Sequence, residues 1–307
     1  MKNSPTFEEI NSLFANSDPD KVWDQMAAIV CRIDPGYEFR IVRAIFDDVL
    51  RLFGGEYPGY SSVKTLYHDL THTLDVFLCA ARLMHGLHLS GRALTGDEVS
   101  LVLVATLMHD IGYAQLEGEE NGTGAQYTQT HVKRGVAFMQ RYMTERQFPA
   151  SFVASLEHMI SSTDHALNFS EIAFPDDRVR LLGQLVATAD LTGQMANRAY
   201  LEKLLFLYLE FKEAQFGNFR SLHDMLRQTR KFYEVTLAKL DGQFGALYVN
   251  LALHFKDTMG AGRNYYMESI EKKITYLSHV IELDEADLYS MLKRDGIVEK
   301  AQAIAAP

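Results

Sequence analysis

The stretch YHDLTHTLDV, from Tyr67 to Val76, decides how the rest of the chain is interpreted. Within it, His68 and His72 are four residues apart, and Asp75 follows three residues later. On an α-helix, residues three and four apart lie on one face, so these side chains can converge on a single point. The stretch therefore predicts a helix that presents histidines and a carboxylate to a common site.

Two apolar runs deliver further candidates to the same interior. LVLVATLMHDIGY contains His109 and Asp110 at the end of its apolar part, and LLGQLVATADLTGQM carries Asp190 in the same way. Such runs are typical of buried helices. A buried, unpaired carboxylate is expensive, and a metal ion beside histidines is a usual compensation. The three stretches together predict a metal site between helices.

Composition narrows the class of protein. The chain has 307 residues and a net charge of -10, which argues against a nucleic-acid partner, since such a partner requires a basic surface. The N-terminus has acidic residues where a secretion signal would be basic and then apolar, and no apolar run is long enough to span a membrane. The two cysteines, Cys31 and Cys79, are expected to be buried thiols in a reducing, cytoplasmic setting.

The apolar spacing predicts an all-α fold with no strands. Gly54-Gly55 predicts the end of one helix, and Thr95 to Glu98 predicts the capped start of another. The polar, glycine-containing segment 115–126 is predicted to be a mobile loop beside the metal pair, either a flap over the site or a plain surface connection. We expect an N-terminal helical extension (1–59), a core (60–215) and C-terminal helices (216–307), packed as one structural domain.

The order His72, His109-Asp110 and Asp190 resembles the HD superfamily of metal-dependent phosphohydrolases. YHDLTHTLDV is similar to the signature of cyclic-nucleotide phosphodiesterase catalytic domains, and Tyr67 begins it. This resemblance implies an HD-type helical bundle in which His72 binds metal. It also implies that His68 is the general acid for the leaving oxygen, for which an acidic neighbour is expected.

Other segments extend the resemblance. LEHMISSTDHA is similar to the Thr-Asp segment of these domains, which implies that Thr163 and Asp164 lie near the site. Asp75 and Asp164 are candidates for holding the histidine ligands, whereas Asp69 is expected to be solvated. Gln243, in KLDGQFGALYV, loosely resembles the glutamine that holds a purine, with Phe244 or Phe255 as a stacking surface.

The pair itself departs from the phosphodiesterase form. It continues as HDIG followed by Tyr113, which resembles bacterial HD and HD-GYP proteins, although the GYP element is absent and many of them have lysine where Tyr113 stands. In that subgroup, positions similar to His131 and His158 hold a second metal. We therefore expect two divalent ions (Mn, Fe, Zn, Mg, Ni or Co), with Asp110 bridging them and also taking part in catalysis.

The resemblance implies hydrolysis of a small-molecule phosphate ester, a cyclic nucleotide or related diester, by metal-bound hydroxide. Three alternatives stay open: a nucleotide phosphomonoesterase, an HD domain with a sensing or regulatory role and no turnover, and an HD-type di-iron oxygenase. Neither nucleic acid nor a membrane is an expected partner. The terminal helices are candidates for closing the pocket or for a contact between two copies of the chain.

Overall fold

The computed structural model describes residues 6–119 and 121–305. Residues 1–5, where the expectation about a secretion signal begins, lie outside the described residues. In the first half of the chain the α-helices are α1 (Phe7–Ser12), α2 (Pro19–Ile33), α3 (Arg40–Gly54), α4 (Leu70–Leu89), α5 (Gly96–Met108), α6 (His131–Glu145) and α7 (Ala150–Ser161). In the second half they are α8 (Asp177–Ala196), α9 (Tyr200–Glu213), α10 (Leu222–Asp241), α11 (Leu251–Met259), α12 (Tyr265–Val280), α13 (Glu285–Met291) and α14 (Ile297–Ala305).

Short 3-10 turns connect several of these helices. They are η1 (Ile111–Tyr113), η2 (Ala125–Tyr127), η3 (Phe169–Glu171), η4 (Leu247–Asn250) and η5 (Arg294–Gly296). Residues 6–119 and 121–305 contain no strand, only one isolated antiparallel bridge between Tyr60 and Leu116. The predicted all-α fold is confirmed. None of the helices within the described ranges combines the length and apolar content that crossing a membrane requires.

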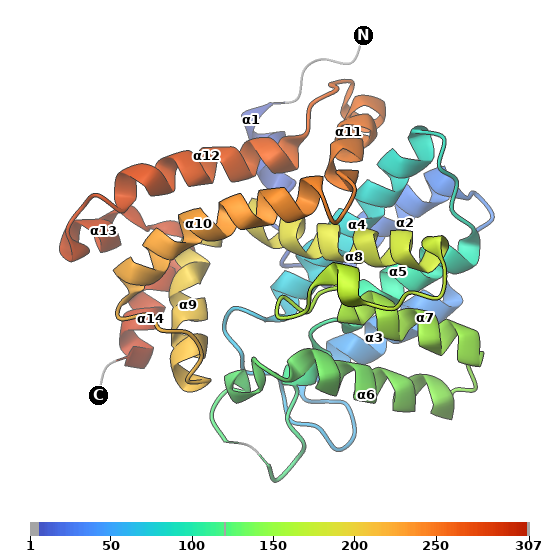
Figure 1. Ribbon diagram of the computed structural model, residues 1–307, viewed down its shortest axis with the longest axis horizontal. Coiled ribbons are helices and arrows are strands. Elements are labelled where there is room, and N and C mark those ends of the chain that lie inside the picture. Colours follow the sequence, from blue (N-terminus) through green and yellow to red (C-terminus); the bar gives the residue numbers. More distant parts are fainter. Residues whose placement is uncertain (1–5, 120, 306–307) are drawn as a thin grey trace.

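Helix α4 is the centre of the fold. Every residue from His72 to Leu87 is buried, because α8 packs along it and α2, α5 and α11 cover its other sides. Figure 1 shows α4, α5 and α8 in the middle of the molecule, with α10 and α12 running side by side at one side. A helix that is enclosed all round must find partners for its polar side chains inside the protein. That requirement applies to the histidine and aspartate of its first turns.

One cluster of buried apolar side chains extends from Phe14 to Ala301. It draws on all three segments that the sequence analysis distinguishes. The boundaries at residues 59 and 215 stay predictions, but the cluster is what a single packed unit would have.

Two predicted helix ends are confirmed. Helix α3 stops where Gly55 adopts a left-handed backbone (φ 78°), which glycine does without steric cost. Helix α5 begins with a complete capping box, in which Thr95 and Glu98 bond to each other's backbone N–H. The capping box fixes the start of α5, the helix that leads to His109 and Asp110.

Several predictions of local structure are wrong. His68 does not belong to the helix of His72, because Asp69 caps that helix and α4 begins only at Leu70. Cys31 is exposed, since it lies opposite the apolar face of α2, whereas Cys79 is buried as expected. Helices α11 and α14 were not predicted; each has only nine residues, too few for a clear apolar period.

Candidate metal centre

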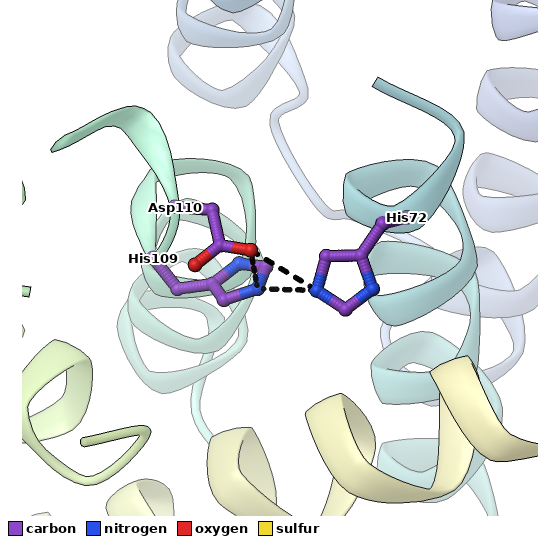
Figure 2. A group of neighbouring side chains, drawn as sticks. All are labelled: His72, His109 and Asp110. Atoms are coloured by element: carbon purple, nitrogen blue, oxygen red, sulfur yellow. Dashed lines mark hydrogen bonds and ion pairs between the residues drawn. The ribbon is translucent and has the colours of Figure 1, made fainter. Parts of the chain in front are cut away.

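Three helices bring four of the predicted ligands together. His72 comes from the first turn of α4, His109 and Asp110 follow the last residue of α5, and Asp190 lies in α8. All four are at most 5% exposed. Figure 2 shows His72 facing His109 and Asp110 from the neighbouring helix, with dashed lines joining one oxygen of Asp110 and one nitrogen of each ring.

The ligand atoms face one another across short distances. His72 Nε2 lies 3.0 Å from His109 Nε2, and Asp110 Oδ2 lies 3.1 Å and 3.2 Å from these two nitrogens. Asp190 Oδ1 lies 3.4 Å from His72 Nε2 and 3.7 Å from His109 Nε2. Two nitrogens and two carboxylate oxygens therefore surround one small volume in the protein interior.

This arrangement fits a metal ion. Two ligands bound at about 2.1 Å, with an angle of about 90–110° between them, are about 3.0–3.4 Å apart, close to the distances observed. Asp110 Oδ2 forms no well-directed hydrogen bond within the described chain, although it is buried. An imidazole and carboxylate set suits a first-row divalent ion. His72, His109 and Asp110 thus form a buried group that could hold a metal ion.

The ring orientation of His109 is also that of a ligand. Its Nδ1 lies 2.8 Å from the backbone carbonyl of Thr106, so Nδ1–H donates there and Nε2 keeps its lone pair. His72 Nε2 faces that lone pair at 3.0 Å. Two nitrogen lone pairs repel each other at this distance unless a proton or a metal ion lies between them.

The charges of the group favour a cation. Burial alone would lower the pKa of His72, but hydrogen bonds and charge interactions with Asp110 and Asp190 outweigh it and raise the pKa to about 10. His109 follows the same pattern, with its pKa raised. Burial raises the pKa of the two carboxyl groups, yet the imidazoles beside them bring both below the ordinary value. Protons on the two imidazoles or a divalent ion therefore balance the charge of the two carboxylates.

Metal binding should release a proton and depend on pH. Because His72 with a pKa of about 10 is protonated at pH 7, an ion must displace that proton. Between pH 6.5 and 8.5, we expect the affinity for Mn²⁺ to rise about tenfold for each pH unit. Calorimetric titrations in buffers of different ionisation enthalpy measure both the dissociation constant and the proton count. A dissociation constant that does not change with pH would contradict the protonated His72.

The second oxygen of Asp110 faces another histidine. His131 Nε2 lies 3.5 Å from Asp110 Oδ1, and its Nδ1 lies 2.7 Å from the carbonyl of Thr128, again the orientation of a ligand. Burial lowers the pKa of His131, which keeps the imidazole neutral. Tyr113 stacks on His131 and on His68, with ring centroids 4.5 Å and 4.7 Å apart, and the two imidazoles lie side by side with centroids 6.1 Å apart. The Tyr113 ring thus holds both imidazoles in place.

The glycine of the HDIG motif permits this packing. A Cβ added to Gly112 would lie 1.8 Å from the carbonyl oxygen of His131 and 2.7 Å from the backbone N of Gly135. Both obstacles are backbone atoms, which cannot rotate away. Gly112 therefore lets η1 contact the start of α6 and sets the position of His131.

Gly112→Ala is expected to destabilise the protein by at least about 2 kcal/mol, because the added methyl group forces the two backbones apart. Gly54→Ala is the matched control, since a Cβ there meets nothing within 4 Å. Chemical denaturation of both variants measures the free energy of unfolding. Equal stability of the two variants would contradict the close approach.

Glu210 in α9 contacts the predicted general acid, and the sequence did not predict this role. Its Oε2 lies 2.7 Å from His68 Nδ1, and its Oε1 accepts the backbone N–H of Tyr67 at 2.6 Å. Glu210 is 2% exposed. The acidic neighbour expected for His68 is therefore present, but it comes from 142 residues further along the chain. The amphipathic pattern around Glu210 does not distinguish it from other polar residues. The one available signal is that a glutamate occupies a position on the buried face of the helix.

The glycine-containing loop is tied to the same helix. Thr123 donates through its backbone N–H and its hydroxyl to the two carboxylate oxygens of Glu213, both at 2.8 Å. Gln115, predicted to belong to the mobile loop, is buried. Parts of the segment are therefore anchored rather than free, and the flap stays a prediction.

Asp75, predicted to hold a histidine ligand, instead binds side chains from the segments around the site. Its two oxygens accept the side-chain amides of Asn16 at 2.8 Å and Asn197 at 2.6 Å. It thus joins the N-terminal segment, α4 and the end of α8. Asp69, expected to be solvated, caps α4 through the His72 N–H and pairs with Lys203 at 3.2 Å.

Burial raises the pKa of Asp75 to about 6, against the charge of Lys203 and the bonds from Asn197 and Asn16. A raised pKa means that ionisation destabilises the fold: the penalty is absent below about pH 4, grows as pH rises, and is complete above pH 6. Asp75→Asn removes it, so the stability of the variant relative to wild type should rise by up to about 3 kcal/mol between pH 4 and 7. Denaturation with a chelator present measures this difference; a constant difference across that range would contradict the shifted pKa.

Several predicted residues line a small hollow next to Asp190. They include Thr163, Asp164, Gln243 and Phe244. Gln243 Oε1 is buried without a hydrogen-bond partner in the described chain, so it is available to a donor. Phe255, the other predicted stacking residue, is wrong for this role, because it is fully buried against Tyr265.

Two other histidines differ from expectation or stay untested. The His158 ring contacts Phe174, with centroids 5.8 Å apart, and its role as a second-ion ligand stays a prediction. The sequence puts His85 beyond the face of His68 and His72, which predicts a place near solvent; this is wrong, because His85 is 2% exposed and its Nδ1 lies 3.0 Å from that of His254. Helix α11 covers α4 at this point, which the sequence did not reveal because α11 itself was not predicted.

The chain was compared with known proteins. No curated protein is similar enough in sequence to count as a match. Residues 114–269 match the family described as Npun_R2479-like. The match covers just over half of the chain and includes His131, Asp190 and Glu210, while it begins directly after η1. The chain therefore belongs to the Npun_R2479-like family.

Proposed function

We propose that this protein is a metal-dependent phosphohydrolase that cleaves a small phosphodiester. The main support is the convergence of His72, His109, Asp110 and Asp190 on one buried point, with the His68–Glu210 pair next to it. A cation site and a proton donor are the two components that ester hydrolysis of this kind needs. The resemblance of the same residues to the HD superfamily agrees with this reading.

In this proposal, His72, His109, Asp110 and Asp190 hold one ion. His131, which faces the second oxygen of Asp110, and His158 would hold another, with Asp110 as a ligand of both. Divalent ions in such a site lower the pKa of a bound water to about 7 and neutralise phosphoryl oxygens.

His68 supplies the proton that the leaving oxygen requires. With 16% of its side chain accessible, His68 is more exposed than His72, His109 and the two aspartates, so a substrate can reach it. Glu210 orients the ring through Nδ1, which directs Nε2 away from the carboxylate. Tyr113 stacks on the ring face and restricts its rotation. The acid is thus held in one orientation before substrate binds.

The substrate is proposed to be a nucleotide or a related diester. Support comes from the hollow beside Asp190, where Gln243 offers a buried acceptor and Phe244 an aromatic side chain. A base carrying an N–H donor would satisfy Gln243 Oε1. The same hollow begins at a proposed metal ligand, but its volume is about 10 Å³, the space of one water molecule, so a base would enter it only if its walls moved apart.

The test is hydrolysis of bis-p-nitrophenyl phosphate by chelator-treated protein before and after addition of Mn²⁺. We expect turnover only after metal is restored, and little turnover of p-nitrophenyl phosphate. Preference for the monoester would shift the function to a phosphomonoesterase. Absence of turnover of either ester by protein shown to contain metal would refute the proposal.

A further inference from the structure

A second cavity lies beside the first turn of α4, outside the metal centre. Its volume is about 440 Å³, within the range of roughly 300–1,000 Å³ that ligand pockets occupy. Its walls come from the N-terminal segment around Phe14, the start of α4, the connection between α8 and α9, and η5 with α14. None of the metal-site residues described above lines it.

Cationic side chains gather around this cavity in a protein whose net charge is -10. They are Arg198, Lys203 and Lys300. Lys203 is paired with Asp69 at 3.2 Å. Within residues 6–119 and 121–305, neither the guanidinium of Arg198 nor the ammonium of Lys300 has an ion-pair partner. Asp295 is the other carboxylate of the lining, so the positive charges are in excess.

Apolar side chains form part of the remaining lining, together with the polar residues Asn16, Ser17, Thr71 and Asn197. Phe14 and Phe206 are 5% and 8% exposed and form part of the wall, with Ile297 beside them. Helix α9 begins at this wall with Ala199 as its N-cap, and the acidic Glu202 of its first turn is buried and paired with Arg294 at 3.2 Å. A ligand that suits the cavity therefore has an anionic group and a flat or apolar part.

We propose that this cavity binds a small organic phosphate of about the size of a nucleoside monophosphate. Its phosphate contacts Arg198 and Lys300, and its apolar part lies against Phe14 and Phe206. This site is independent of the proposed hydrolytic function, because its residues differ from those of the metal centre. It lies close to that centre nevertheless, since Asp69 belongs to the cavity wall and caps the helix of His72.

The experiment is a calorimetric titration of the full chain with AMP and, separately, with inorganic phosphate. The protein is treated with chelator, and Asp110→Ala is titrated in parallel, so that binding to metal is removed in two ways. We expect one AMP to bind in both cases, more tightly than phosphate. The double variant Arg198→Ala with Lys300→Ala should weaken AMP binding at least tenfold.

Lys272→Ala is the matched control, because Lys272 is an exposed cation of α12 outside the cavity, and it should leave AMP binding within twofold. Circular dichroism of the variants checks the fold. If AMP binding required metal and Asp110, AMP would bind at the metal centre and the proposal would be overturned. If AMP binding survived the double variant, AMP would bind outside this cavity, with the same consequence. Absence of binding at millimolar AMP would also overturn it, and equal affinity for inorganic phosphate would exclude an organic ligand.

Discussion

Asp110→Ala is expected to lower metal-dependent hydrolysis of bis-p-nitrophenyl phosphate by about 10³-fold or more. Removal of a residue that only supports a metal ligand typically costs about 10–100-fold, and Asp110 contacts the proposed ions directly. One of its oxygens faces His72 and His109, and the other faces His131. Its loss therefore removes a ligand from both proposed ions at once. Steady-state kinetics and the metal content of the purified variant measure the effect.

Asp177→Ala provides the comparison, because Asp177 is fully exposed in the first turn of α8, the helix that carries Asp190. We expect its activity and metal content to equal those of the wild type. If Asp110→Ala retained both its metal and its activity, a site centred on this carboxylate would be refuted. Loss of activity with full metal content would mean that Asp110 acts on the substrate rather than on the ion.

His68→Ala is expected to separate substrates by their leaving groups. An alkoxide leaves poorly without a proton, so hydrolysis of 3′,5′-cyclic AMP, or of another dialkyl phosphate that the wild type cleaves, should fall by about 10²–10⁴-fold. A p-nitrophenolate ion is stable without a proton, so bis-p-nitrophenyl phosphate should lose less than about tenfold. The ratio of kcat/KM for the two substrates is the measurement. Equal losses on both substrates would exclude His68 as the proton donor.

Glu210→Gln tests the partner of His68 without emptying the site. The glutamine oxygen can still accept the Tyr67 N–H, but an amide nitrogen replaces the oxygen that faces His68 Nδ1. We expect the same selectivity as in His68→Ala, with a smaller loss of about 10–100-fold on the alkyl ester. A variant that loses activity equally on both esters would mean that Glu210 serves the fold alone.

The sequence predicted best what depends on neighbouring residues. Apolar periods placed α4, α5 and α8, and the capping pair Thr95 and Glu98 placed the start of α5. His72, His109 and Asp190 converge because each follows or lies in a buried helix, a property visible in the local run of apolar residues. Their meeting point required only that those helices pack together.

Contacts between residues far apart in the sequence could not be predicted from local patterns. Glu210, Asn16 and Asn197 contact the site region from distant segments, and each is an unremarkable polar residue in its own stretch. The predicted start of α4 is also wrong. Asp69 was expected to be solvated, but its side chain caps the helix. Caps and cross-chain hydrogen bonds are decided by tertiary packing, for which periodicity carries no signal.

Helix α9 carries two hydrogen-bonding carboxylates one turn apart. Glu210 contacts His68, and Glu213 accepts from Thr123 of the glycine-containing loop. Because both carboxylates belong to one helical turn, the anchor of the loop and the partner of the proton donor come from the same element. A foreign loop that lacks both bonds to Glu213 would lose its attachment to the helix that orients His68.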